Sequence, residues 1–185
     1  MSAFEFFFSF YGLILGLSVA EIVTGLVRVF KQRQRVRVGW LTPMLALFVL
    51  LDIASFWVGA WISMQDLNVS YRLIFLGLVI AGIYFAAASL VTPDDLNEWP
   101  DFDDFYDRHK RFVLAGVAIA NLIASHLVRP LSGGGMENYA APEVWFWIVS
   151  NNLFLLVLAL VRNRRINVAL LAFGIGMYLL TAVLG

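Results

Sequence analysis

The sequence predicts an all-α, polytopic membrane protein with six transmembrane helices and both termini on the non-cytoplasmic side. Three observations support this prediction. The 185 residues are 61% hydrophobic and 14% charged, whereas a soluble domain has about 45–50% apolar and 25% charged residues. Six apolar stretches are each long enough for a helix that crosses the hydrocarbon layer of a bilayer. The basic residues, finally, are concentrated in alternate connections between these stretches.

The six spans are expected at residues 4–30, 40–64, 71–92, 111–131, 143–162 and 166–185, as one transmembrane domain over residues 1–185. Each span must be helical, because lipid offers no hydrogen-bond partner to an open backbone group. The stretches also lack the alternation of polar and apolar residues that is typical of a membrane β-barrel.

The distribution of basic residues predicts the orientation of the spans. Cytoplasmic loops of membrane proteins carry an excess of Lys and Arg. Eleven of the thirteen basic residues fall in the first, third and fifth connections. They are Arg28, Lys31, Arg33, Arg35 and Arg37, then Arg108, Lys110 and Arg111, then Arg162, Arg164 and Arg165. Only Arg72 and Arg129 lie outside this set, so these three connections are predicted to be cytoplasmic.

The longest connection, residues 93–110, is predicted to be an acidic cytoplasmic loop. A helix start is expected at Pro100, and from there the helix could continue unbroken into the fourth span. The loop includes four carboxylates that could bind a partner protein: Asp101, Asp103, Asp104 and Asp107. The more ordinary interpretation is a solvated segment that caps helices and is balanced by neighbouring basic residues. The loop lacks the glycine and terminal glutamate of an EF-hand, and the chain has no cysteine, so we expect no metal site.

Several polar residues lie at membrane depth, where an ionisable group costs at least about 2.5–3.5 kcal/mol. They are Glu21 in the first span, Asp52 in the second, Asn121 and His126 in the fourth, and Asn151 and Asn152 in the fifth. A polar path for a proton, cation or small solute would explain them. Hydrogen bonds that only hold helices together would explain them too. If Glu21 and Asp52 are buried together, at least one is expected to carry a proton.

The two halves of the chain align weakly, which is compatible with a 3+3 inverted repeat. GLSVAEIVTG from Gly16 aligns with GVAIANLIAS from Gly116, so that Glu21 corresponds to Asn121. In the same register Asp52 corresponds to the pair at 151 and 152. Inverted repeats are common in transporters, whose sites lie between the halves. Small and apolar residues also align readily between unrelated membrane helices, and this alternative stays open.

The first span carries a ladder of small residues, Gly12, Gly16 and Ala20. Such a ladder permits close approach of two helices. It would serve packing within the chain or the interface of a homo-oligomer, and the sequence does not decide between them.

These patterns favour a small transporter or channel of a bacterial-type inner (plasma) membrane, which passes a proton, cation or small polar solute along the intramembrane carboxylates. The alternative is a non-transporting scaffold or sensor subunit that binds a partner through the acidic loop. An enzyme is not expected, because the intramembrane polar groups are few and mostly amides. We likewise expect the lipid bilayer as a partner, but no cofactor and no nucleic acid.

Overall fold

The structure is a computed structural model that describes residues 3–64, 70–95, 98–131 and 140–184. It confirms the all-α fold with six helices, all long and apolar enough to cross a membrane. Their bounds are Ala3–Lys31 for α1, Leu41–Met64 for α2, Tyr71–Ser89 for α3, Phe102–Ile123 for α4, Pro142–Leu160 for α6 and Arg164–Leu184 for α7. The chain is therefore a multi-pass membrane protein.

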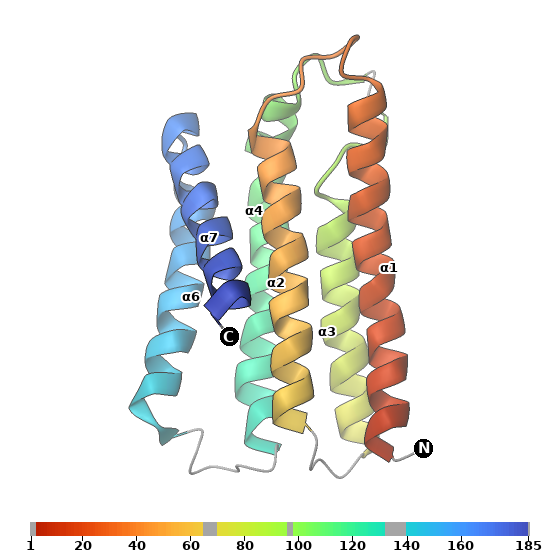
Figure 1. Cartoon of the computed structure of the whole chain (residues 1–185), viewed down its shortest axis with the longest axis vertical. Coiled ribbons are helices and arrows are strands. Elements are labelled where there is room, and N and C mark those ends of the chain that lie inside the picture. The colour runs from red at the N-terminus through yellow and green to blue at the C-terminus, as the bar shows by residue number, and fades with distance from the viewer. Residues whose placement is uncertain (1–2, 65–69, 96–97, 132–139, 185) are drawn as a thin grey trace.

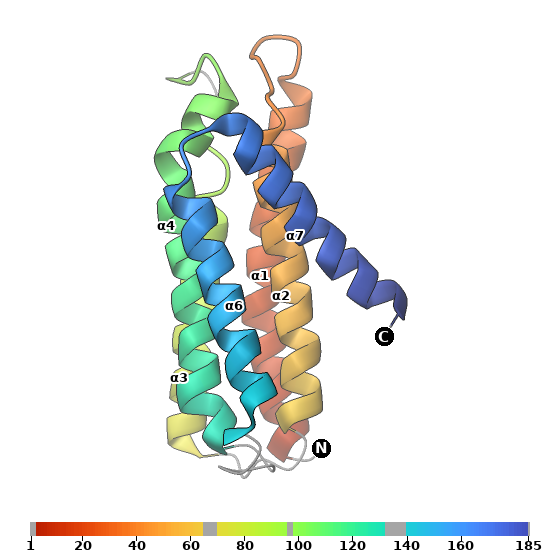
Figure 2. The same ribbon diagram turned by 90° about the vertical axis from the view of Figure 1, so that its left-hand side faces the viewer.

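Helices α1, α2, α3 and α4 stand side by side, and α6 and α7 cover one flank of this bundle (Figure 1). α1 packs along α3, and α3 packs along α4. α6 lies against α4 and α7 lies against α2, whereas α6 and α7 have little contact with one another. Toward its C-terminal end, α7 leans away from the bundle (Figure 2). The surface between α6 and α7 is consequently hollowed.

The loop residues 32–40, 90–95, 98–101 and 161–163 lie together at one end of the bundle (Figure 1). We call it the basic end, because the eleven basic residues of the three odd connections lie in or beside these loops. Arg72, near the start of α3, and Arg129, past the end of α4, belong to the opposite end. The structure thus brings together the charges that the sequence grouped. That the basic end faces the cytoplasm stays a prediction.

The fourth span continues the helix that was expected to start near Pro100. The apolar span itself was expected from residue 111, and α4 begins at Phe102, where the Asp101 carboxylate accepts a hydrogen bond from the Asp103 backbone N–H at 2.9 Å. This is the usual way to satisfy a free N–H at a helix start. At its other end α4 loosens into a π-helical turn, Ala124–Val128, and a 3-10 turn, Arg129–Leu131. Much of the expected acidic loop is therefore helical.

The small-residue ladder of α1 is only partly used within the chain. A Cβ at Gly12 would lie 2.7 Å from Cζ2 of Trp57, so the missing side chain lets α1 approach α2 there. At Gly16 such a Cβ would meet no atom of another helix within 4 Å among the described residues, and Ala20 is exposed. Close packing in the chain thus accounts for Gly12, while a homo-oligomer through the ladder stays a prediction.

The two halves of the chain do not pack alike. α1 and α3 are in contact along their lengths, whereas α4 and α7, the corresponding pair of a 3+3 repeat, meet mainly at the basic end. The inverted repeat therefore stays a hypothesis from the sequence, and the packing of the helices gives it no support.

Candidate functional site: a buried carboxylate between two tyrosines

The candidate site is built around Asp52, which lies near the middle of α2 and is only 4% exposed. Each of its carboxylate oxygens accepts a hydrogen bond from a tyrosine. Tyr84 of α3 donates to Oδ2 at 2.7 Å, and Tyr178 of α7 donates to Oδ1 at 2.7 Å. Among the described residues, no basic side chain lies within 4 Å of this carboxylate. Asp52 thus has hydroxyl partners in place of a counter-ion.

Asn121 of α4 extends this cluster. Its amide lies 3.1 Å from the Tyr84 hydroxyl, which has only one proton and gives it to Asp52 at the shorter distance. The Oδ1 of Asn121 therefore lies beside this hydroxyl as a second, more distant acceptor. The amide nitrogen of Asn121 is buried and has no hydrogen-bond partner among the described residues.

A polar cavity of about 140 Å³ adjoins Asn121, between α4 and α6. Its polar lining consists of Asn121, Ser125, Arg129, Asn151 and Asn152. Asn152 donates to the Ile148 carbonyl at 2.8 Å, but its own side-chain oxygen is buried and has no partner among the described residues. At roughly 30 Å³ per water molecule, the cavity can hold a few waters. Such waters could accept from the amide nitrogen of Asn121 and donate to the amide oxygen of Asn152.

The structure therefore brings together four of the six polar residues that the sequence singled out, Asp52, Asn121, Asn151 and Asn152. His126 lies in the π-helical turn nearby. Its Nδ1 is 3.0 Å from the Leu122 carbonyl, and its ring is edge-on to Trp145 of α6. It does not line the cavity.

Glu21 is separate from this group. Its carboxylate lies 3.5 Å from the Arg28 guanidinium, seven residues further along α1, and its side chain is 31% exposed. Seven residues are almost two full helical turns, so both side chains share one face of α1. Glu21 is therefore directed toward the basic end, whereas the partners of Asp52 come from α3 and α7.

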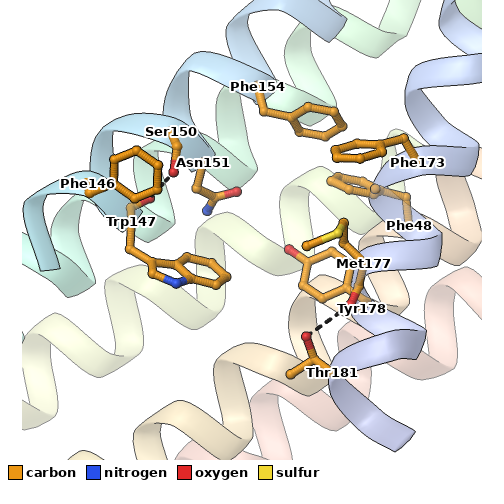
Figure 3. A pocket seen from close by; sticks show the side chains of 11 residues that line it. Phe48, Phe146, Trp147, Ser150, Asn151, Phe154, Phe173, Met177, Tyr178 and Thr181 are labelled. Atoms are coloured by element: carbon orange, nitrogen blue, oxygen red, sulfur yellow. Dashed lines mark hydrogen bonds between the residues drawn. The ribbon is translucent and has the colours of Figure 1, made fainter. Parts of the chain in front are cut away.

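A larger groove of about 440 Å³ lies on the other side of the cluster, between α6 and α7 (Figure 3). Six aromatic residues are among its described lining: Phe48, Phe146, Trp147, Phe154, Phe173 and Tyr178. The polar lining is Ser150, Asn151, Tyr178 and Thr181. Tyr178 consequently belongs both to the groove and to the hydrogen bonds of Asp52. Asn151 lines the groove and the small cavity alike.

The four carboxylates predicted to bind a partner form contacts within the chain. Asp101 caps α4 and lies 3.9 Å from the Arg37 side chain. Asp103 accepts from the Leu41 backbone N–H at 3.1 Å, at the start of α2. Asp104 and Asp107 both bind the guanidinium of Arg164, which donates to Asp107 at 2.7 Å.

A second polar cluster at the basic end joins α4 to the start of α7. Asn167 is fully buried, and its side-chain oxygen accepts from Tyr106 at 2.8 Å and from the Lys110 ammonium at 3.0 Å. Lys110 also donates to the carbonyl of Val161, just after the end of α6. Positive charge is favourable at the C-terminal end of a helix. This cluster fixes the α6–α7 turn and gives the buried lysine its partners.

The sequence analysis did not identify the roles of two tyrosines, Tyr84 and Tyr178. A tyrosine in the middle of a span is itself a signal, because its buried hydroxyl needs a partner. A partner for Asp52 could have been sought among such residues.

Comparisons with protein-family models, with curated proteins and with solved structures gave no match to this chain. Its function must therefore be inferred from the site itself.

Proposed function

We propose that the chain is a small proton-coupled transporter of a bacterial-type inner membrane, with Asp52 as the group that takes up and releases the proton. The observation that carries this proposal is a carboxylate with 4% exposure in mid-span, bonded on both oxygens at 2.7 Å by hydroxyl groups. No basic side chain of the described residues forms an ion pair with it. Ionisable residues at this depth mark proton and substrate pathways more often than they serve packing.

The two tyrosines suit a carboxyl group that changes its protonation state. A hydroxyl donates to a carboxylate and can accept from a carboxylic acid, so Tyr84 and Tyr178 can pair with Asp52 in both forms. A fixed Lys or Arg could pair only with the ionised form. An amide in place of Asp52 would link the same helices without placing a charge in the membrane. This argues against a purely structural role.

The small cavity supplies a connection for the proton. Asn121 borders both Tyr84 and the cavity, which extends past Ser125 to Arg129 beyond the end of α4. Waters in the cavity, together with Asn121 and Tyr84, would carry a proton between Asp52 and the end opposite the basic end. Asn151 and Asn152 would line this path.

The test is proton flux into liposomes that contain the purified protein and an internal pH-sensitive dye. Asp52→Asn should reduce pH-driven flux at least roughly tenfold, the minimum expected when a positioned proton-transfer group is lost. Glu21→Gln is the matched control, because it neutralises the other carboxylate at membrane depth and should leave flux within about twofold. Circular dichroism and size exclusion establish that both variants fold. Unchanged flux in a folded Asp52→Asn protein overturns the proposal.

The alternative, a scaffold that binds a partner through Asp101, Asp103, Asp104 and Asp107, has less support. These side chains cap helices or pair with Arg37 and Arg164. A partner would have to compete with those contacts.

A further inference from the structure

The groove between α6 and α7 has the size of a site for a small organic molecule. Its volume of about 440 Å³ falls in the usual range of about 300–1,000 Å³. α7 leans away from the bundle (Figure 2), and the groove lies between α6 and α7, on a flank that would face lipid in a bilayer. Phe146 and Phe173 are 74% and 61% exposed, with ring surface available to a ligand. A molecule could thus enter from the bilayer, which selects for lipophilic compounds.

Three hydroxyl groups in the groove can act as acceptors, because their protons are already used. The Ser150 hydroxyl donates to the Trp147 carbonyl at 3.2 Å, and that of Thr181 donates to the Met177 carbonyl at 3.0 Å (Figure 3). Tyr178 gives its proton to Asp52. Each of these oxygens retains lone pairs, and the Asn151 amide adds one donor group and one acceptor. The hydroxyl oxygens and the negative faces of the aromatic rings both attract cations.

No basic residue is among the groove's described lining, and the carboxylate of Asp52 lies directly behind the Tyr178 hydroxyl. A saturated acyl chain would fill the groove without using its acceptors, its ring faces or this carboxylate. A positively charged ligand would use all three.

We propose that the groove binds a lipophilic aromatic cation, and that this cation and a proton compete for the charge of Asp52. The inference rests on the proposed function, because it gives the transporter its class of substrate. When the cation enters, Asp52 is ionised and its proton leaves through the small cavity. When Asp52 is protonated, the groove loses its nearest negative charge and the cation is released. One positive charge replaces one proton, so charge balances at the site.

Tetraphenylphosphonium is a suitable probe, with tetraphenylborate as an anion that carries the same four rings. Binding to the full chain in detergent is measured by isothermal titration calorimetry, and proton release is measured with a pH dye in weakly buffered solution. We expect tetraphenylphosphonium to bind at least roughly tenfold more tightly than tetraphenylborate and to release about one proton. The preference should disappear, together with proton release, in Asp52→Asn.

Three phenylalanine variants locate the probe. Phe146→Ala and Phe173→Ala should each weaken binding of the cation roughly 3- to 30-fold, as expected for loss of one ring from a cation site. Both side chains are largely exposed, so their loss should not prevent folding. Phe75→Ala is the matched control, because Phe75 is 53% exposed on α3 and is not in the groove. It should leave the affinity unchanged.

Equal affinity for both probes, or an affinity that does not change in Phe146→Ala and Phe173→Ala, would mean that the probes partition into the micelle. Either result would refute the proposal that the groove is a cation site. Co-purified lipid that neither probe displaces would mean that an acyl chain is the occupant, with the same consequence. The flux lost in Asp52→Asn would still support proton coupling in either case. Cation binding in the groove without proton release would instead overturn the competition at Asp52.

Discussion

Replacing Tyr84 with Phe isolates one hydroxyl of the candidate site. The side chain is fully buried, and its hydroxyl lies 2.7 Å from Asp52 and 3.1 Å from Asn121. A hydrogen bond contributes about 0.5–1.5 kcal/mol between neutral groups and about 1.5–3 kcal/mol when one group is charged. Bonds between transmembrane helices average about 0.6 kcal/mol, because the unfolded chain in a membrane finds other partners. Since Asp52 keeps its bond to Tyr178, we expect Tyr84→Phe to lower the free energy of unfolding by about 1–3 kcal/mol.

The assay is reversible unfolding by SDS in mixed micelles, followed by far-UV circular dichroism. Tyr71→Phe is the matched control, because Tyr71 is 84% exposed at the start of the same helix, and it should change stability by less than about 0.5 kcal/mol. In an Asp52→Asn background the effect of Tyr84→Phe should shrink by about 1 kcal/mol, the coupling expected of residues in one network. If the two tyrosine variants lose equal stability, the bond to Asp52 contributes nothing and the reasoning about the site fails.

Three further predictions concern the frame around the site and use the same unfolding assay. Asn167→Ala should lower the free energy of unfolding by about 2–4 kcal/mol, because it leaves the buried Lys110 ammonium and the Tyr106 hydroxyl without their acceptor. The control Asn163→Ala, at the exposed start of α7, should lower it by about 1 kcal/mol, and equal losses would contradict the role of the buried cluster. Gly12→Ala should lower the free energy of unfolding by about 1–3 kcal/mol, because the added methyl group clashes with α2, whereas Gly16→Ala should leave it unchanged. A shift from dimer to monomer in Gly16→Ala, measured by analytical ultracentrifugation, would support the predicted oligomer. Arg164→Ala should lower stability by about 1 kcal/mol or less, because its ion pairs are part-exposed, and the loss should diminish at high salt; a salt-independent loss would point to packing.

The six spans could be predicted because the signal for each is local. A helix in lipid pairs its own backbone groups, and its length is set by the bilayer, so twenty apolar residues suffice to find it. The grouping of basic residues needed no tertiary contact either. Asp52 could be identified for a similar reason, because its cost at mid-membrane is a property of one residue and its depth.

Hydropathy alone could not place the start of α4, although Pro100 indicated a helix start close to the observed one at Phe102. Residues Asp101 to Lys110 are polar enough to resemble a loop, but in the structure their polar side chains find partners on neighbouring helices. Asp103 binds the start of α2, and Lys110 binds Asn167 of α7. A prediction that weighs hydropathy alone assigns such residues to water. Glu21 shows a second limit, because the sequence grouped it with Asp52 in one candidate path, whereas in the structure its partner is Arg28 on its own helix.

The pairing of Asp52 with Tyr178 depends on how α7 packs against α2 and α6, which no local sequence pattern predicts. The two residues are 126 positions apart. A Cβ at Gly174 would lie 2.8 Å from the Phe48 ring and 3.1 Å from the Phe154 ring, so α7 can lie this close to α2 and α6 only where it has no side chain. Tyr178 follows one helical turn later, on the same face as Gly174. Because α7 leans away toward its C-terminal end, the contact that brings Tyr178 to Asp52 also positions it beside the hollow between α6 and α7. Gly174 therefore permits one packing arrangement of α7 that produces both the Tyr178–Asp52 hydrogen bond and the groove. A side chain at position 174 would disturb both together.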